Sequence, residues 1–537
     1  MAISEGATAT VESASGKRRG DLVAAAFVIA AVAFGLVSLT YPFGRDQGLY
    51  FYVAREWVKH GSIPYRDILD HKTPGIYFIH ALSILVFGET MWGIRVLELG
   101  AVLACGAAAA AIASPPEERL RRPILAGGAF AMSLLYFGSF DFWDTAQSEI
   151  WYTLFGFLAV AFARRAPSLP RAALAAGAFA GAAVIMKPPA IWFAFAAAGV
   201  LIQRIAKAGE ANIPTLALHA ARFAGAAAIV PVLSLGYFAA HGALGALVDV
   251  VVGANGYYVK HEKGADNIID AIVGGVRHFA PLSVLLPLGA VFAILYGRRE
   301  QNKEMVARSS LGLLLLAAGF MATAMQGKFY LLHQGSMIGP LCVLAIVFAL
   351  NLENIVKGAL GTIAPAVLLF CMFCVSAWTG GGLLMWKAAV HTALDYRAGR
   401  ISREDYIKTF RRPNVAFWYD QSVHVADWLA AHTTPEDSVT VRGFEPQIYA
   451  LANRRHVGRF FWTTFIVNPD RAYRREEWLA EDLRDVTEHP PKYIVSIDWA
   501  QSSVDSKAWA EQLGYERVEL IGDAAIMAKK EVWPSLD

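Results

Sequence analysis

The sequence has few cysteines, little net charge and no concentration of basic residues. Three of the four cysteines, Cys105, Cys342 and Cys371, lie inside apolar runs, and Cys374 closely follows Cys371. This placement provides neither a disulfide framework nor a four-ligand metal site, so we interpret the cysteines as packing residues. The net charge of +3 is small for 537 residues, and the excess Lys and Arg lie in short loops. Nucleic acid is therefore not an expected partner.

Apolar residues, in contrast, make up 56% of the chain, which is too much for an ordinary soluble protein. The first apolar run, Leu22 to Tyr41, has the roughly 20 residues that a helix needs to cross about 30 Å of hydrocarbon. Further runs occur at 91–113, 123–140, 149–163, 171–186, 188–203, 218–241, 279–296, 309–325, 334–351 and 358–379. We therefore expect an α-helical polytopic membrane protein with about 11 transmembrane helices.

Basic residues predict the orientation. Lys17, Arg18 and Arg19 precede the first run and favour a cytoplasmic N-terminus. A cleavable signal peptide, cut after Ala31-Val32-Ala33, is the alternative, but the apolar run continues past that site, so we expect an anchor. Alternate loops, at 117–122, 164–171, 203–222, 297–308 and 351–357, contain Lys or Arg and are assigned to the cytoplasm. The loops at 42–90, 141–148, around Lys187, at 242–278 and at 326–333 then face outward.

Two short helices are expected within the first outer loop. The apolar run 75–87 is short for a crossing and fits a re-entrant or interfacial helix. In 47–59, helical periodicity places Leu49, Tyr52, Val53 and Trp57 on one face, with Arg55 and Lys59 on the other. This pattern is typical of an amphipathic helix that lies in the membrane interface, with its cations toward the headgroups.

The composition changes after about residue 380, because no further apolar run reaches the length of a span. Strand-like pieces at 438–441 and 493–497, and a helical piece at 423–432, predict a soluble α/β domain. We therefore divide the chain into a cytoplasmic tail (1–20), a transmembrane domain (21–387) and an extracytoplasmic α/β domain (388–537).

Chemically active residue types gather in the outward loops. The first outer loop contains Arg45, Asp46, Asp67, Asp70, His71 and Lys72, and later outward loops contain Asp144, Gln147, Glu149, Lys187, Lys260, His261, Lys328 and His333. Carboxylates suit the deprotonation of a hydroxyl nucleophile, and fixed cations suit a phosphate whose charge grows as it leaves. Both are needed to move a group off a lipid phosphate.

Each of these residues could also be an ordinary surface charge without a role in function. Outer loops of any membrane protein carry charges, and Lys or Arg near a span commonly reaches to headgroups. This alternative stays open for the later loops. It is weaker for Asp46, which lies between Gly44 and Gly48, and for Lys72, which precedes Pro74-Gly75. His71 with Asp70 does not predict a metal site, because adjacent side chains point apart and no spacing elsewhere completes a ligand set.

A signature spread over about residues 20–380 resembles a known family. It comprises Gly44-Arg45-Asp46-Gln47-Gly48, the Gly61-x-x-Pro64-Tyr65 turn, Asp70-His71-Lys72-Thr73-Pro74-Gly75, and Phe87-Gly88 followed by Arg95. In order and spacing this is similar to the polyprenyl-phosphate-sugar-dependent glycosyltransferases of the GT-C class, close to the branch of the protein mannosyltransferases and lipid A aminoarabinose transferases.

The resemblance implies a role for each candidate. Asp46 corresponds to the catalytic acid that faces the acceptor hydroxyl and the anomeric carbon, and Lys72 to the lysine that holds the lipid phosphate. Thr73 stands directly after Lys72, where the family often has a proline. Gln47 stands where many members have a second acid, so no metal or other cofactor is expected, with a divalent cation as the alternative. The remaining assignments are donor binding for Arg45, His71 and Lys187, and acceptor or sugar binding for Asp70, Asp144, Glu149 and His333.

We therefore expect a multi-pass glycosyltransferase of the bacterial inner membrane. It moves one sugar, with inversion, from a polyprenyl phosphate to a hydroxyl of a cell-envelope glycan, lipid or protein, and its active site faces outward. Its partners are the donor, the acceptor and the bilayer. The alternative is a transporter or channel for an anionic or lipid-linked substrate, although the predicted spans are nearly free of the buried charges that such a protein needs. A structural scaffold comes third.

Overall fold

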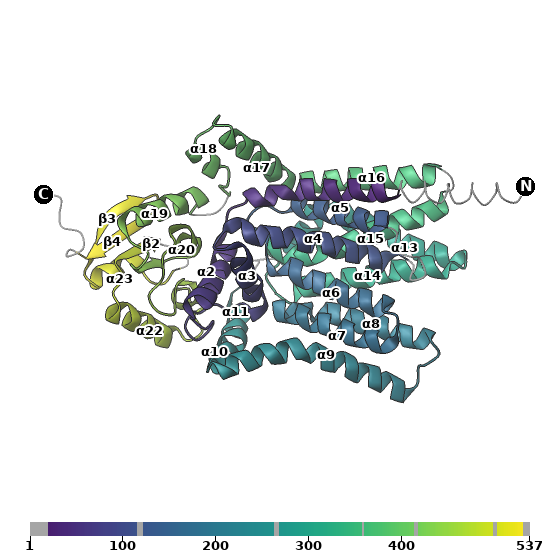
Figure 1. Cartoon of the computed structure of the whole chain (residues 1–537), viewed down its shortest axis with the longest axis horizontal. Coiled ribbons are helices and arrows are strands. Elements are labelled where there is room, and N and C mark those ends of the chain that lie inside the picture. The colour runs from purple at the N-terminus through teal and green to yellow at the C-terminus, as the bar shows by residue number, and fades with distance from the viewer. Residues whose placement is uncertain are drawn as a thin grey trace, which may run out of the picture. The chain divides into compact units, whose positions relative to one another are not determined.

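The computed structural model describes residues 20–114, 122–262, 268–356, 359–412, 417–497 and 502–529. These residues form two compact units (Figure 1). The helical unit comprises the described residues within Met1–Leu39, Arg95–Val232 and Gly264–Lys387. The mixed unit comprises the described residues within Thr40–Ile94, Leu233–Lys263 and Ala388–Asp537. Both units are thus discontinuous in sequence. The predicted tail, with Lys17, Arg18 and Arg19, lies outside the described residues, and the predicted domain boundaries stay a prediction.

Helices form the helical unit, most of them long and apolar, and some of them continue into the mixed unit. They are Gly20–Thr40 (ending in η1, Leu36–Thr40), α4 (Met91–Ala113), α5 (Arg122–Ser139), α6 (Ser148–Arg165), α7 (Leu169–Met186), η2 (Pro188–Ala190), α8 (Ile191–Lys207), α9 (Ile213–Ala240), α12 (Ile268–His278), α13 (Leu282–Arg299), α14 (Lys303–Ala324), η4 (Leu331–Gln334), α15 (Gly335–Ile355), α16 (Ala359–Thr379) and α17 (Gly382–Arg397). A helix occurs at each of the predicted apolar runs.

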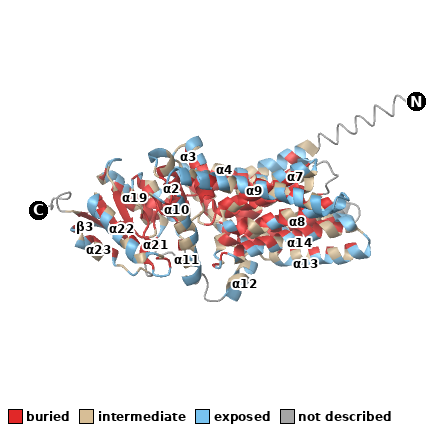
Figure 2. Ribbon diagram, turned by 90° about the horizontal axis from the view of Figure 1, so that it is seen from below, coloured by how far each residue is buried: buried red, intermediate tan, exposed pale blue. Residues whose placement is uncertain are grey.

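Within the described part of the chain, eight of these helices are long and apolar enough to cross a membrane, or up to nine if the bent pair α16 and α17 is one span. Figure 2 shows that α13 has an exposed side. Apolar residues lie on it: Leu288 and Phe292 are each 61% exposed. Such faces are stable against lipid but not against water. The chain is therefore a multi-pass membrane protein, as predicted.

Small residues allow the helices to approach closely. A Cβ atom on Gly106 of α4 would lie 2.3 Å from the carbonyl oxygen of Gly128, and one on Gly128 of α5 would lie 2.4 Å from that of Gly106. Gly181 of α7 meets the carbonyl oxygen of Ala227 of α9 in the same way, at 2.1 Å. Contact between backbones replaces the hydrophobic driving force that helices lack in lipid.

The mixed unit combines short helices with one sheet. Its elements are α2 (Arg45–His60), α3 (Pro74–Phe87), α10 (Leu244–Val248), the π-helix η3 (Asp249–Ala254), α11 (Asn255–His261), α18 (Arg403–Lys408), α19 (Tyr419–His432), β1 (Val439–Arg442), α20 (Gln447–Ala452), α21 (Thr464–Val467), α22 (Arg475–Glu488), β2 (Tyr493–Ile497), α23 (Ser506–Gln512), β3 (Tyr515–Ile521) and β4 (Ala524–Lys529). Both predicted strands and the helix predicted at 423–432 are confirmed.

The four strands lie in the order β1-β2-β4-β3. β1 and β2 are parallel, with Val439 opposite Tyr493, and the other two pairings are antiparallel. Ile494, Met527 and Tyr515 pack into an apolar core on this sheet. The predicted fold class, a polytopic helical protein with a C-terminal α/β part, is therefore confirmed.

Proline and glycine define the ends of the two helices in the first outer loop. α3 begins at Pro74, whose missing N–H is not needed in a first turn, and stops before Gly88. α2 ends at Gly61, where φ is 73° and the backbone N–H bonds to the carbonyl of Glu56. Only glycine adopts that left-handed conformation without strain.

One expectation for α2 is wrong. Arg55 does not face headgroups: it is 1% exposed, and its guanidinium donates to the carbonyl of Arg454 at 2.7 Å and to Asn453 Oδ1 at 3.1 Å. The end of α20 leaves carbonyls without helical partners, and the arginine satisfies them. Lys59 is exposed, as predicted. α2 is therefore packed against the C-terminal part of the mixed unit along the face that carries Arg55.

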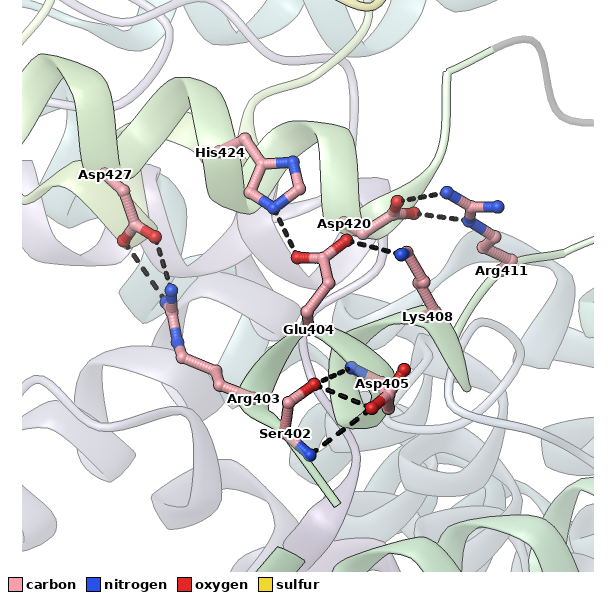
Figure 3. Close-up of polar contacts among 9 residues, drawn as sticks. All are labelled: Ser402, Arg403, Glu404, Asp405, Lys408, Arg411, Asp420, His424 and Asp427. Carbon is pink, nitrogen blue, oxygen red and sulfur yellow. Dashed lines mark hydrogen bonds and ion pairs between the residues drawn. The ribbon is translucent and has the colours of Figure 1, made fainter.

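A polar network connects the short helix α18 to α19 (Figure 3). Arg403 pairs with Asp427, and Glu404 lies between His424 at 2.7 Å and Lys408 at 2.9 Å. Ser402 caps α18 in a capping box with Asp405. These contacts explain how a helix of six residues is held. None of the predicted site residues belongs to the network.

Candidate functional site

Asp46 and Lys72 are both close to Tyr50 in the mixed unit. Asp46 is in the first turn of α2, and its half-buried carboxylate has no hydrogen bond or ion pair with any described residue. Tyr50 is one turn further along, which places the two Cβ atoms about 5–6 Å apart on one face of the helix. The Lys72 ammonium lies 5.8 Å from the centre of the Tyr50 ring. The two residues with the main predicted roles thus both lie near one tyrosine ring.

The Lys72 ammonium is half-buried and has no carboxylate partner among the described residues. Its backbone is fixed, because Tyr65 donates a hydrogen bond of 2.8 Å to the Lys72 carbonyl. Tyr65 has φ of 71°, so the turn predicted at Gly61 to Tyr65 contains a left-handed residue. A cation held in place without an internal anion is available for an external one.

Asp70 is 1% exposed and has several hydrogen bonds. Tyr77 donates to one carboxylate oxygen, and the backbone N–H of His71 donates to the other at 2.7 Å. The His71 ring nitrogen Nδ1 lies 3.0 Å from the same oxygen. Asp70 therefore orients His71, so the geometry favours a positioning role over direct contact with a substrate.

Aromatic rings surround His71. Its ring centre lies 4.7 Å from that of Phe465 and 5.8 Å from that of Tyr258. Burial and the neighbouring charge of Lys72 hold the pKa of His71 below its usual range, although Asp70 opposes this shift. The imidazole is therefore neutral at neutral pH, and Nε2, the nitrogen not paired with Asp70, is directed away from that contact.

Arg45 is engaged within the mixed unit. Its guanidinium pairs with Glu445, which is 2% exposed, and lies 5.0 Å from the centre of the Phe444 ring. Burial raises the pKa of Glu445, and the charge of Arg45 opposes that shift. The pair holds the start of α2 in position, so Arg45 has a structural reason to be present.

Glu149 and Lys187 form a pair in the helical unit, with 2.7 Å between Nζ and Oε1. Pro188 forces Lys187 into an extended conformation at the end of α7, with φ −167° and ψ 130°, and so turns its side chain out of the helix. Glu149 lies in the first turn of α6, where the helix dipole favours a carboxylate. Its second oxygen, Oε2, is buried and has no hydrogen-bond partner among the residues that the structure describes.

Two further candidates also lie in the helical unit. Asp144 is 3% exposed in the segment between α5 and α6. His333 is 7% exposed in η4, and its carbonyl accepts a bond of 3.1 Å from Thr323. A Cβ on Gly335, two residues later, would lie 2.9 Å from Cβ of Glu149, so this segment packs against the Glu149–Lys187 pair. In the mixed unit, Lys260 and His261 are exposed at the end of α11, as expected of ordinary surface charges.

Glu98 was not among the predicted site residues, although it forms a fully buried pair with Arg95 inside α4. Arg95 donates to Thr145 Oγ1 at 2.8 Å and to the carbonyl of Phe142 at 3.2 Å. Tyr136 donates to Glu98 at 2.7 Å. The pair therefore shapes the 141–147 segment that carries Asp144. The sequence did contain a signal for this pair, because residues three positions apart lie on the same face of a helix.

Metal ligands are not clustered in the described part of the chain: no group of three or more His, Cys, Asp or Glu side chains is placed to hold an ion. All four cysteines are free; Cys105 and Cys342 are buried as packing residues, whereas Cys371 is exposed on an apolar helix. Independence from metal stays a prediction.

Comparison with known proteins reveals the fold. No protein-family model and no curated protein matches the chain. The structure is similar to that of ArnT from Cupriavidus metallidurans bound to undecaprenyl phosphate, with a TM-score of 0.58 and 14% identity over 94% of this chain and 97% of that chain. The apo state of the same ArnT gives 0.55 and 13% with the same coverage. The archaeal oligosaccharyltransferase AglB from Archaeoglobus fulgidus, in complex with an inhibitory peptide and a dolichol-phosphate, gives 0.44 and 13%, over 95% of this chain and 75% of that chain. The chain therefore has the fold of a GT-C membrane glycosyltransferase, as the resemblance predicted.

Proposed function

We propose that this protein is a glycosyltransferase of the bacterial inner membrane. It moves one sugar from a polyprenyl phosphate to a hydroxyl of a cell-envelope glycan, lipid or protein on the outer face. The observation that carries the proposal is that the Asp46 carboxylate and the Lys72 ammonium, both close to Tyr50, have no ion-pair partner among the described residues. The solved ArnT structure contains undecaprenyl phosphate, which supports the class of donor.

Asp46 is the general base. Its carboxylate accepts the proton of the acceptor hydroxyl as the oxygen attacks the anomeric carbon. The bond from that carbon to the phosphate oxygen breaks at the same time, so the sugar is transferred with inversion. Because no described residue donates to the carboxylate, its lone pairs are available for this proton.

Lys72 stabilises the leaving group. Negative charge on the lipid phosphate increases as the glycosidic bond breaks, and a cation fixed beforehand stabilises that charge most in the transition state. Asp70 and Tyr65 contribute indirectly, because they fix the backbone from which Lys72 extends.

His71, Arg45 and the Glu149–Lys187 pair have supporting roles. In neutral His71, Nδ1–H donates to Asp70, so Nε2 accepts a hydrogen bond from a hydroxyl of the sugar donor. Arg45 holds the start of α2 and thereby the position of Asp46. Glu149 Oε2, which lacks an internal partner, accepts from a sugar hydroxyl, while Lys187 neutralises Glu149. Asp144 and His333 are assigned to the acceptor or sugar.

Transfer in vitro tests the proposal. The full-length protein in nanodiscs is incubated with a panel of purified polyprenyl-phosphate sugars, and transfer to envelope glycan, lipid and protein fractions is measured for wild type and Asp46→Asn. We expect transfer from at least one donor and its loss in the variant. Movement of a labelled donor across the bilayer without transfer would favour the transporter alternative instead.

A further inference from the structure

The mixed unit contains a second polar site that none of the roles above uses. A cavity of about 350 Å³ lies between α2, the 62–68 segment, the 455–459 segment and α22. This is several times the space that one water needs, so the cavity can hold a small polar ligand. We refer to it as the polar cavity.

Carboxylates and guanidiniums both line the polar cavity. Its carboxylates are Glu56, Asp67, Glu481 and Asp485, and its guanidiniums are Arg66, Arg455 and Arg459. Three ion pairs join them: Arg66 to Asp67 at 2.7 Å, Arg455 to Glu56 at 2.9 Å, and Arg459 to Glu481 at 3.4 Å. The charges therefore nearly cancel. Each ion pair presents hydrogen-bond donors of a guanidinium beside hydrogen-bond acceptors of a carboxylate.

Asp485 is the exception among these four carboxylates, because it has no ion pair with a described residue. Its one hydrogen bond is a long one, 3.4 Å, from the backbone N–H of Arg459. Gly458, with φ of 76°, allows the chain to pass this close: a Cβ there would lie 2.3 Å from Asp485 Oδ2. The 455–459 segment is also fixed to the first loop, because Leu69 N–H donates to the Arg459 carbonyl at 2.9 Å. The polar cavity is thus a built feature of the fold.

The chemistry of the lining selects the ligand. Four carboxylates against three guanidiniums repel phosphate, and an apolar chain would desolvate seven charges. Sugar hydroxyls both donate and accept, so adjacent hydroxyls match a carboxylate beside a guanidinium. We infer that the polar cavity binds one saccharide unit, neutral or amine-bearing, of a carbohydrate acceptor.

This inference rests on the proposed function and makes the acceptor class more specific. α2 carries Asp46 in its first turn and Glu56 at the polar cavity, ten residues later, which is about 15 Å along the helix. One sugar ring cannot reach both. The acceptor is therefore an oligosaccharide or a glycan-bearing molecule, in which the polar cavity holds one unit while another meets Asp46.

Direct binding tests the inference separately from transfer. Binding of short neutral oligosaccharides, amino-sugar oligosaccharides and inorganic phosphate to the full-length protein in nanodiscs is measured by saturation-transfer NMR and calorimetry. The variants are Asp485→Asn and Glu481→Gln, with Glu488→Gln as the matched control, because Glu488 is an exposed carboxylate at the end of the same helix. Thermal unfolding of each variant verifies that it folds.

We expect an oligosaccharide to bind, and each cavity variant to weaken that binding by about ten-fold or more, as the loss of one charged hydrogen bond does. Glu488→Gln and Lys72→Ala should bind the saccharide as wild type does. In transfer assays the cavity variants should raise KM for long acceptors with kcat little changed. Absence of saccharide binding, tighter binding of phosphate, or equal binding by wild type and both cavity variants would overturn the inference. Failure of transfer from every donor, with saccharide binding intact, would instead count against the proposed function.

Discussion

Replacement of Asp46 by Asn changes one atom of the carboxylate and removes its ability to accept a proton. If Asp46 is the base, turnover should fall by about 10²- to 10⁴-fold. Polyprenyl phosphate should bind nearly unchanged, because the ammonium of Lys72 is intact. Single-turnover transfer and binding of labelled polyprenyl phosphate measure the two effects. Asp523→Asn, a change of an exposed carboxylate in the turn before β4, is the control. Full activity of Asp46→Asn would remove Asp46 from the mechanism.

The two lysines of the first loop provide a matched pair. Lys72→Ala should weaken donor binding and turnover together, because its charge acts on the phosphate in the ground state and the transition state. Lys59→Ala should leave transfer within a few-fold of wild type, since Lys59 is exposed and adds only about 1 kcal/mol of attraction to a lipid surface. Equal damage from both substitutions would contradict the assigned role of Lys72.

The pH dependence of stability should report on His456, in the segment between α20 and α21. Burial and the charge of Arg442 lower the pKa of His456 from 6.5 to about 3. Above pH 6.5 its ring is neutral in the folded and unfolded protein alike. Below that value the unfolded chain binds a proton that the folded protein does not, so the free energy of unfolding should decrease as pH falls from about 6.5 toward about 3.

Thermal unfolding at neutral and at mildly acidic pH tests this expectation. His456→Gln keeps a polar side chain but cannot take up the proton, so its Tm should decrease less on acidification than that of wild type. An identical decrease in both proteins would assign the acid sensitivity to other groups.

At the scale of helices, the crossing of α4 and α5 depends on two glycines that face each other. Gly106→Leu would place a side chain where the Gly128 carbonyl now lies, and overpacking of this kind costs about 1–3 kcal/mol or more. Gly100→Leu on the same helix meets open space, since no atom lies within 4 Å of its Cβ position. Tm and folded yield in detergent should decrease for Gly106→Leu alone. A stable Gly106→Leu protein would show that the helices can separate without loss.

The sequence predicted the helices well and their partners poorly. Apolar runs, Pro74 at the start of α3 and Gly61 after α2 are local signals, and each lies where the sequence indicated. Arg55 was assigned to the wrong environment, because helical periodicity separates two faces but does not reveal what covers each face. The ion pair between Glu149 and Lys187 could not be predicted from the sequence either, since it depends on how α6 and α7 pack.

Orientation across the bilayer is a property of the whole chain. A reporter fused after Lys387 should behave as extracytoplasmic, because we predict an odd number of crossings from a cytoplasmic N-terminus. Alkaline phosphatase and green fluorescent protein fusions at this position, with a fusion in the 297–308 loop as the cytoplasmic control, measure it. A cytoplasmic signal after Lys387 would mean that α3 crosses the membrane and that the outward site must be abandoned.

Chelation tests the expected chemistry of the whole enzyme. Asp46 is followed by Gln47 rather than a second acid, and the described residues hold no cluster of three metal-binding side chains. We therefore expect transfer to survive EDTA. Loss of activity that Mg²⁺ or Mn²⁺ restores would make Asp46 and Glu149 the first candidate ligands.

The discontinuity of the mixed unit could not be predicted from local patterns, since it joins residues about as far apart as the chain allows. Arg55 donates to the carbonyl of Arg454, which lies 399 positions later. At a synthesis rate of about 5–20 residues per second, Arg454 is made roughly 20–80 seconds after Arg55. The loop that carries Asp46 and Lys72 is therefore among the first parts to leave the ribosome and among the last to be completed. Ribosome-bound chains that end before residue 454 should present this loop to proteases, whereas full-length chains should protect it.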